Sequence, residues 1–208
     1  MPEPSPKNPT IAAYDQYHDV YDREVVEFWN KFPPTTVQAF CDNLPGQQVL
    51  DLGSGSGRDA LILRHHGLEV TCLDASEKMI EQTQRLGFKS RKADFSDMQL
   101  PEQSFDGVWA YTSLIHVPPS EATQAIRDIV RTLRPNGVFL IGVIIGDDAG
   151  MVERKTMPGA KRYFKQYRPT EVTNMVSSLG FKLRYEEKYQ PHNTVYLSQV
   201  YVMEPSAQ

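Results

Sequence analysis

The sequence predicts an α/β protein with a doubly wound, mostly parallel sheet of seven strands that ends in an antiparallel hairpin. Two observations lead to this prediction. Short apolar segments alternate with amphipathic segments over most of the chain, which is the pattern of strands joined by crossover helices. The last two strand candidates follow each other without a helical segment between them and alternate between apolar and polar residues, as antiparallel strands do.

The expected strands are short and are bounded by turn-forming or acidic residues. They comprise residues 49–52, 69–74, 88–93, 104–110, 138–145, 181–187 and 194–203. The first and the fifth are mostly apolar, which is typical of strands that are covered on both faces. These central strands are therefore expected to carry the core of the sheet.

The helices are recognised by their caps and by apolar spacing. Ser76 is a favourable N-cap residue, Met79 and Ile80 begin an apolar face, and Gly87 ends that helix. An apolar stripe at helical spacing starts after Ser120. The expected helical segments are residues 10–32, 34–42, 60–67, 76–87, 120–133 and 169–179.

Length and composition indicate one domain. Residues 1–9 contain prolines at positions 2, 4, 6 and 9 and are expected to form a disordered tail. The remaining residues, 10–208, are enough for one substantial core. No apolar run approaches the ~18 residues of a membrane helix, and no signal peptide is recognised, so we expect no membrane partner.

Charge and cysteine content narrow the function classes. The two cysteines give no disulfide framework, which favours a reducing cytoplasm. A net charge of −4 and a pI near 5.7 give no general attraction to nucleic acid. A nucleic-acid substrate is therefore not expected.

The segment from residue 49 to residue 59 combines a buried strand, a glycine turn and a helix start. Gly53, Gly55 and Gly57 permit positive φ angles and remove side chains, so that a ligand can approach the backbone. The helix N-terminus favours an anionic group, and Asp51 can bind a cationic amine beside it. Because an amino-acid group carries both charges, the turn predicts a cofactor that contains an amino acid.

Asp74 predicts a nucleoside in the same cofactor. It ends the second strand, beside the glycine turn, where an acid can bind both ribose hydroxyls. NAD-binding folds use the same device, but their fingerprint needs glycine at position 58, where this sequence has Arg58. A helix cap is the alternative role for Asp74, although Ser76 already fills that position.

This series of features resembles the class I methyltransferases that depend on S-adenosylmethionine (SAM). The glycine turn, Asp74 and the Asp94-Phe95 pair follow one another as in that superfamily, and the likeness covers residues 10–204. It implies a Rossmann-like methyltransferase fold with SAM as cofactor and S-adenosylhomocysteine as product. It also implies that Asp94 accepts from the adenine amino group while Phe95 contacts the ring. Three acids at three strand ends, with Asp51 as the third, are difficult to explain as packing alone.

The resemblance assigns further residues to the cofactor. Residues 75–79 form a wall for one adenine face, and the helical segment 10–45 covers the cofactor as a lid, with Tyr14 and Tyr17 best placed to reach it. Ordinary packing is the alternative for these tyrosines. The full set of predicted cofactor-binding residues is Tyr14, Tyr17, Asp51, Gly53, Ser54, Gly55, Arg58, Asp74, Ala75, Met79, Asp94, Phe95, Ala110 and Tyr111.

Tyr111 and His116 are the candidates for catalysis. They follow the fourth strand, and residues just past the ends of parallel strands face the ligand crevice. A base is needed only if the acceptor must lose a proton, and histidine titrates near neutrality. A structural role, with the ring bonded to backbone, is the alternative for His116. We recognise no cluster of metal ligands.

Residues 146–167 lack clear periodicity and are rich in cations. The cations are Arg154, Lys155, Lys161, Arg162 and Lys165. A solvated loop is one interpretation. The other is a substrate lid whose cations receive an acidic group.

A narrower likeness exists to small bacterial methyltransferases of the tellurite-resistance and small-molecule type. Three short segments carry it, residues 55–61, 105–109 and 113–118. The sequence departs from that pattern at residues 143–145, at Gln190 and at Tyr196. Because these regions bear on the substrate, the identity of the methyl acceptor stays open.

The resulting hypothesis is a cytoplasmic SAM-dependent methyltransferase that acts on a small molecule, as a monomer or homodimer. A nicotinamide-dependent reductase is a second hypothesis, against which Asp51 and Arg58 count. A SAM-binding module that serves regulation or partner binding without chemistry is the third. The sequence does not separate it from an enzyme because methyltransferases share no single catalytic residue.

Overall fold

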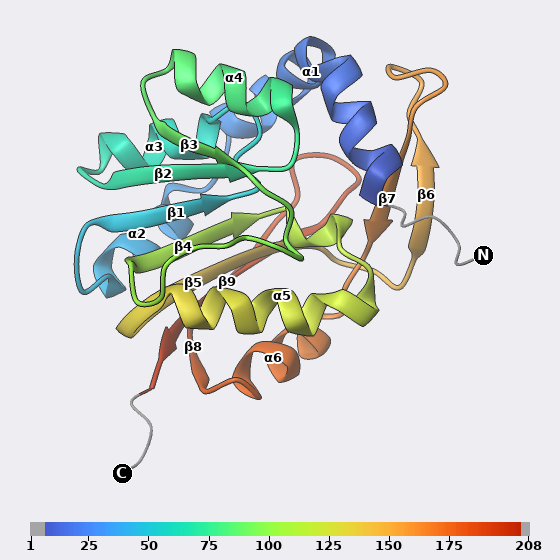
Figure 1. Cartoon of the computed structure of the whole chain (residues 1–208). Coiled ribbons are helices and arrows are strands. Elements are labelled where there is room, and N and C mark those ends of the chain that lie inside the picture. Colours follow the sequence, from blue (N-terminus) through green and yellow to red (C-terminus); the bar gives the residue numbers. More distant parts are fainter. Residues whose placement is uncertain (1–6, 205–208) are drawn as a thin grey trace.

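A computed structural model describes residues 7–204, which form one large and one small sheet with six α-helices in that part of the chain (Figure 1). In chain order the elements are α1 (Lys7–Asn30), α2 (Pro34–Asn43), β1 (Gln48–Leu52), α3 (Arg58–His65), β2 (Glu69–Asp74), α4 (Glu77–Arg85), β3 (Lys89–Lys92), β4 (Phe105–Tyr111), the short 3-10 helix η1 (Leu114–His116), α5 (Pro119–Thr132), β5 (Leu133–Ile144), β6 (Ala149–Glu153), β7 (Lys161–Lys165), α6 (Pro169–Ser177), β8 (Phe181–Tyr189) and β9 (Tyr196–Met203).

The large sheet has the strand order β3-β2-β1-β4-β5-β9-β8. Strands β1 to β5 are parallel, whereas β9 is antiparallel to both of its neighbours. The predicted fold class is thereby confirmed, including the seven strands and the hairpin at the carboxyl-terminal end. The strand order reverses between β1 and β4, and parallel sheets bind ligands in the crevice at such a point.

Hydrophobic side chains cover the sheet on both faces because alternate residues of each strand point to opposite sides. Leu50 and Leu52 belong to the cluster that includes α5 and α6, whereas Val49 belongs to the cluster that includes α2 and α3. Figure 1 shows α3 and α4 on one side of the sheet and α5 and α6 on the other. All residues of β4 are buried, as a central parallel strand requires.

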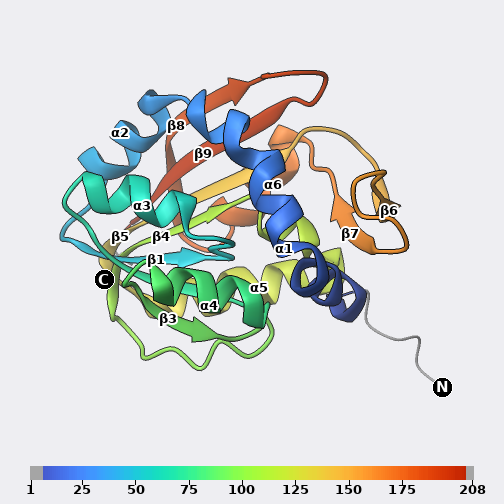
Figure 2. The same cartoon turned by 90° about the horizontal axis from the view of Figure 1, so that it is seen from above.

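Helix α1 and the β6–β7 hairpin lie side by side across the carboxyl edge of the parallel strands (Figures 1 and 2). The Thr10 hydroxyl accepts a hydrogen bond from the backbone N–H of Tyr163 in β7 at 2.9 Å. The Tyr17 hydroxyl donates to the carbonyl of Pro158 between β6 and β7 at 2.7 Å. The backbone of Tyr17 is not helical (φ −117°, ψ 25°), so α1 is kinked there.

Three expectations from the sequence are corrected. Residues 7–9 form the first turn of α1 instead of belonging to a disordered tail, and Lys7 is buried; residues 1–6 lie outside the described residues. The fifth strand begins at Leu133, before the expected residue 138. The segment 146–167 is not an irregular loop, because β6 and β7 form an antiparallel hairpin within it. In residues 7–204, no helix has the length and apolar character needed to cross a membrane.

Candidate functional site

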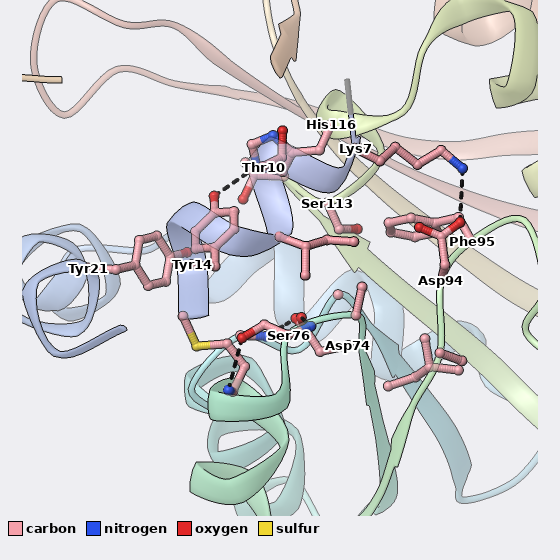
Figure 3. Close-up of a pocket in the computed structure, with 18 of the residues that line it drawn as sticks. Lys7, Thr10, Tyr14, Tyr21, Asp74, Ser76, Asp94, Phe95, Ser113 and His116 are labelled. Atoms are coloured by element: carbon pink, nitrogen blue, oxygen red, sulfur yellow. Dashed lines mark hydrogen bonds and ion pairs between the residues drawn. The ribbon is translucent and has the colours of Figure 1, made fainter. Parts of the chain in front are cut away.

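A cavity lies at the carboxyl edge of the parallel strands, beneath α1 (Figure 3). The glycine turn after β1 and the ends of β2 and β4 form its floor. The start of α4 and the Asp94-Phe95 pair after β3 form one side, and η1 forms the other. Lys7, Tyr14 and Tyr21 reach into it from α1. The cavity therefore lies where the reversal of strand order predicts a ligand.

The glycine turn is fixed to the end of β2 by hydrogen bonds. The Gly53 backbone N–H donates to the Leu73 carbonyl at 2.7 Å. One oxygen of the Asp74 carboxylate accepts from the Gly55 N–H at 2.9 Å, and the other accepts from the Ser76 N–H at 2.8 Å. Because both oxygens are held by backbone donors, the carboxylate is oriented before any ligand binds.

Gly53 is required by space as well as by conformation. Its φ is +75°, and a Cβ atom there would lie 2.3 Å from the Cβ of Ser113. Gly55 has φ +51°, but a Cβ atom there would only touch the Tyr21 ring at 3.7 Å. At Gly55 the obstacle to a side chain is therefore the left-handed backbone, not the crowding that the close approach at Gly53 imposes.

The buried Asp51 and Asp59 and the half-buried Asp74 lie beneath the glycine turn or beside it. Burial raises the pKa of Asp51 well above its ordinary value, and the nearby carboxylates of Asp59 and Asp74 raise it further. Burial also raises the pKa of Asp59 to about 7, although the Trp109 indole N–H donates to this carboxylate at 2.7 Å. A positively charged ligand group would stabilise these carboxylates, so this side of the cavity favours cations.

Asp94 is already engaged by α1. The Lys7 ammonium lies 2.9 Å from Asp94 Oδ1 and also pairs with Glu121 of α5. The Ser96 backbone N–H donates to Asp94 Oδ1 at 2.8 Å. Hydrogen bonds from Lys7 and Ser96 lower the pKa of Asp94 below its ordinary value, against the opposing effect of its partial burial.

Two aspartates anchor α1 over the cavity. Asp15 accepts from the Ser76 hydroxyl at 2.6 Å, at the start of α4. Asp22 accepts from the Ser56 hydroxyl at 2.7 Å and from the Arg58 guanidinium at 3.0 Å, on the glycine turn. The helix is thus held by polar bonds to the start of α4, at one side of the cavity, and to the glycine turn and the first residue of α3.

His116 is held as a neutral imidazole between α1 and β7. Its Nδ1 lies 2.6 Å from the Tyr163 carbonyl, which can only accept, so this nitrogen carries the proton. Nε2 therefore accepts from the Tyr14 hydroxyl at 2.8 Å (Figure 3). Burial lowers the pKa of His116 to about 4, and the nearby cations Arg162 and Arg154 also lower it, although the bond to the Tyr163 carbonyl opposes them.

The structure brings most of the predicted site residues to this cavity. Tyr14, Gly53, Gly55, Asp74, Ala75, Met79, Asp94, Phe95, Tyr111 and His116 line it. The sequence did not single out Lys7, Thr10, Ile11, Tyr21, Thr112 and Ser113, which line it as well. Tyr21 continues the helical spacing of Tyr14 and Tyr17, and this pattern could have identified it. No sequence pattern pointed to Lys7, Thr10 or Ile11.

Other predicted residues lie elsewhere. Tyr17 bonds to the β6–β7 hairpin, and Arg58 bonds to Asp22 of α1. Asp51 is 1% exposed beneath the turn, and Ala110 is buried inside β4. Ser54 and Arg58 line a smaller cavity that adjoins the first one at the glycine turn. Its other lining residues include Gly53, Gly55, Asp59 and Tyr21.

The geometry gives no support to Tyr111 as a base. Its ring packs among Phe28, Trp29 and Phe32 at centroid distances of 4.9–5.9 Å. Its hydroxyl is buried without a hydrogen-bond partner among the described residues. Burial raises its pKa well above the ordinary value, so the phenol keeps its proton.

Residues 7–204 contain no group of three or more histidine, cysteine, aspartate or glutamate side chains that could hold a metal ion. Two buried hydroxyls, those of Ser54 and Ser113, and Asp51 Oδ2 have no hydrogen-bond partner in the same part of the chain. Of these, the Ser113 hydroxyl lines the cavity, and because an unpaired buried polar atom is costly, it fits a ligand that carries a hydrogen-bonding group.

Comparison with known proteins agrees with this geometry. A family model described as a methyltransferase domain matches residues 50–141, which include the glycine turn, Asp74, Asp94 and β4. Residues 50–141 are thus similar to a methyltransferase domain. The predicted superfamily is thereby supported, whereas the tellurite-resistance branch is not shown by the comparisons.

The sequence relatives act on different compounds. The chain is 29% identical over 177 residues to the 27-O-demethylrifamycin SV methyltransferase of Amycolatopsis mediterranei, covering 73% of this chain and 64% of that protein. It is 30% identical over 142 residues to a SAM-dependent Diels-Alderase of Talaromyces variabilis, covering 64% of this chain and 44% of that protein. The chain thus spans about half the length of these two relatives.

A solved structure extends the likeness to nearly the whole chain. The 1,6-didemethyltoxoflavin-N1-methyltransferase of Burkholderia thailandensis, with bound 1,6-didemethyltoxoflavin and S-adenosylhomocysteine, superposes with a TM-score of 0.74 at 22% identity. The alignment covers 99% of this chain and 93% of that one. The fold of the protein is therefore that of the class I methyltransferases.

Proposed function

We propose that this protein transfers a methyl group from SAM to a small-molecule acceptor. The observation that carries the proposal is the oriented Asp74 carboxylate, which lies at the end of β2, bonds to the glycine turn and shares one cavity with Asp94. The match of residues 50–141 to a methyltransferase domain supports it independently. Relatives that bind SAM or its product support the choice of cofactor.

The cavity offers complementary groups to each part of SAM. Asp74 would bind the ribose hydroxyls, and the Asp94-Phe95 pair with Met79 would hold the adenine. The unpaired Ser113 hydroxyl and the acidic region beneath the turn would receive the amino-acid part. Lys7 occupies Asp94 in this structure, so the ammonium must release that carboxylate or share it when adenine binds.

The chemistry requires positioning more than proton transfer. When bound, SAM would supply the methyl group of its sulfonium: the acceptor would bond to the methyl carbon in line as the carbon–sulfur bond breaks, with S-adenosylhomocysteine as the leaving group. Helix α1 lies over the site, where it would exclude water from the reacting groups. His116 is neutral near pH 7 and accepts a hydrogen bond from the Tyr14 hydroxyl, an arrangement that fixes Tyr14 at the boundary of the cavity. A role for His116 as a base stays a prediction.

Substitution of Asp74 tests the cofactor assignment. Asp74→Ala removes the acceptor for two hydroxyls, at a cost of ~1–3 kcal/mol, so SAM should bind about tenfold more weakly or worse. Glu69→Ala, at the other end of β2 and exposed, is the matched control and should bind SAM normally. Isothermal titration calorimetry measures both. A folded Asp74→Ala protein with unchanged SAM affinity would remove the assignment.

A second candidate function is SAM-dependent catalysis without methyl transfer. The observation that favours it is the 30% identity to a protein named as a Diels-Alderase. Incubation of the protein with SAM and a panel of small acceptors separates the two. Release of S-adenosylhomocysteine indicates methyl transfer, whereas conversion of an acceptor without that product indicates the alternative. Membership of the tellurite-resistance branch, a cytoplasmic location and a monomeric or dimeric state stay predictions.

A further inference from the structure

A second cavity adjoins the cofactor cavity on the side of the β6–β7 hairpin. It has a volume of about 430 Å³ and shares Tyr14, Tyr21, Thr112 and His116 with the first. A boundary of four shared residues places the contents of the two cavities next to each other. Under the proposed function, the second cavity is therefore the place for the methyl acceptor.

Arg162 is a buried cation that faces this second cavity and not the first. It belongs to β7 and is only 2% exposed. Its guanidinium lies 5.0 Å from the centre of the Tyr14 ring and 5.2 Å from that of Phe164. Its Nη2 atom is buried without a hydrogen-bond partner among the described residues. A buried charged donor without a partner is costly, so it indicates a missing acceptor.

The charges around the second cavity leave Arg162 uncompensated. Arg154 lies 4.0 Å from Glu24 Oε2, so each partly balances the other, although Glu24 Oε2 is buried without a hydrogen-bond partner among the described residues. No carboxylate in residues 7–204 forms a salt bridge with Arg162. Arg23 and Glu27, which also line the cavity, have opposite charges. The net positive charge is therefore concentrated where Arg162 lies.

The position of Arg162 is fixed relative to both α1 and the catalytic edge. The next residue, Tyr163, donates its N–H to Thr10 and accepts through its carbonyl from His116. These two bonds tie β7 to α1 and to η1. A group bound to Arg162 is thus held at a defined distance from the cofactor cavity.

Part of the lining of the second cavity is aromatic. Phe28 and Trp29 of α1 and Tyr196 of β9 line it, with Phe28 in contact with both of the others at centroid distances of 4.9–5.0 Å. Aromatic side chains favour a flat or apolar molecular body. The cavity thus combines an apolar wall with one buried cation.

We propose that the second cavity binds an acceptor that carries an oxyanion, a carboxylate or a phosphonate, on an aromatic or apolar body, and that Arg162 binds the oxyanion. The guanidinium presents paired N–H donors that match both oxyanions. The proposal rests on the proposed function only in naming this ligand the methyl acceptor. Among the cations of residues 146–167, the proposal assigns the binding of an acidic group to Arg162.

Titration calorimetry on the full chain loaded with S-adenosylhomocysteine tests the proposal with four probes. Benzoate and phenylphosphonate are the two oxyanions, benzyl alcohol is the neutral analogue and benzylamine is the cationic one. We expect at least one oxyanion to bind about tenfold or more tightly than benzyl alcohol. The arm that binds identifies the oxyanion as carboxylate or phosphonate. Equal affinities, no binding of either oxyanion, or tighter binding of benzylamine would overturn the proposal.

Arg162→Met removes the charge while keeping the length of the side chain, and Arg162→Lys keeps the charge. We expect oxyanion affinity to fall about tenfold in Arg162→Met and less in Arg162→Lys. Arg127→Met, at an exposed position of α5, should retain it. A folded Arg162→Met protein that binds the oxyanion normally would overturn the proposal. If Arg162→Met does not fold, Arg162→Lys and the four-probe comparison decide.

Binding of S-adenosylhomocysteine in the same samples separates the two proposals. If the unmodified protein does not bind it, the proposed function fails, and the four-probe comparison on the ligand-free protein still tests Arg162. If it binds but the probes show no preference for oxyanions, only the assignment of Arg162 fails.

Discussion

The cofactor assignment rests mainly on aspartates. Their roles differ although their positions in the sequence look alike. Asp74 lines the cavity with both oxygens held by backbone N–H groups. Asp51 also lies near the end of a strand, one residue before β1 ends, but it is buried beneath the turn. Their positions in the sequence do not distinguish the two aspartates. Whether each side chain reaches the cavity depends on how the glycine turn folds over the ends of the strands.

At the same scale, Asp59 makes the stability of the ligand-free protein depend on pH. Its pKa is about 7 in the folded protein, against an ordinary value of 3.8. Between these values the folded state binds more protons than the unfolded state, so the free energy of unfolding falls as pH rises. The Asp59→Asn variant keeps an acceptor for the Trp109 indole. Its free energy of unfolding, measured by urea denaturation, should fall less over that pH range than that of the unmodified protein. Parallel pH profiles of the two proteins would contradict this.

Among the elements, α1 carries features that the sequence showed only in part. Tyr14 and Tyr17 were expected over the cofactor, but the kink at Tyr17 turns that side chain to the β6–β7 hairpin and leaves Tyr21 facing the cavity. Regular helical spacing does not predict such a break. A lid over the cofactor stays a prediction that the anchors of α1 make testable.

The anchors predict how α1 opens. Asp22→Ala removes the side-chain bonds to Ser56 and Arg58 and leaves only the bond from Arg58 to the backbone carbonyl of residue 22, so α1 should open more often and be cleaved faster in limited proteolysis. S-adenosylhomocysteine should slow cleavage of the unmodified protein by mass action on the closed state. Asp19→Ala, at an exposed position of the same helix, is the control. Cleavage of α1 that responds neither to Asp22→Ala nor to the ligand would argue against a lid.

The hairpin β6–β7 is the element that the sequence did not predict. In β7, Arg162 and Phe164 share the inward face, and a charged residue at an inward position breaks the apolar alternation that identifies strands. The hairpin is held by contacts with α1 and η1, which are distant in sequence. Its burial of Arg162 is therefore a tertiary property that no local pattern records.

For the whole molecule, the order of strands and helices followed from local patterns. The central strands are buried on both faces and read as apolar segments, and the helix caps at Ser76 and Gly87 mark their own positions. The cofactor cavity followed as well, because the carboxyl ends of parallel strands meet at one edge. The second cavity did not, since α1, β7 and β9 form it together from distant parts of the chain.

Under the proposed function, the glycine turn and Asp74 bind SAM and not a dinucleotide. Isothermal titration calorimetry of the unmodified full chain with S-adenosylhomocysteine, and separately with NAD, tests it most directly. We expect saturable binding of S-adenosylhomocysteine at one site and no binding of NAD. Binding of NAD without binding of S-adenosylhomocysteine would contradict it and would assign the cavity to the nicotinamide-dependent alternative.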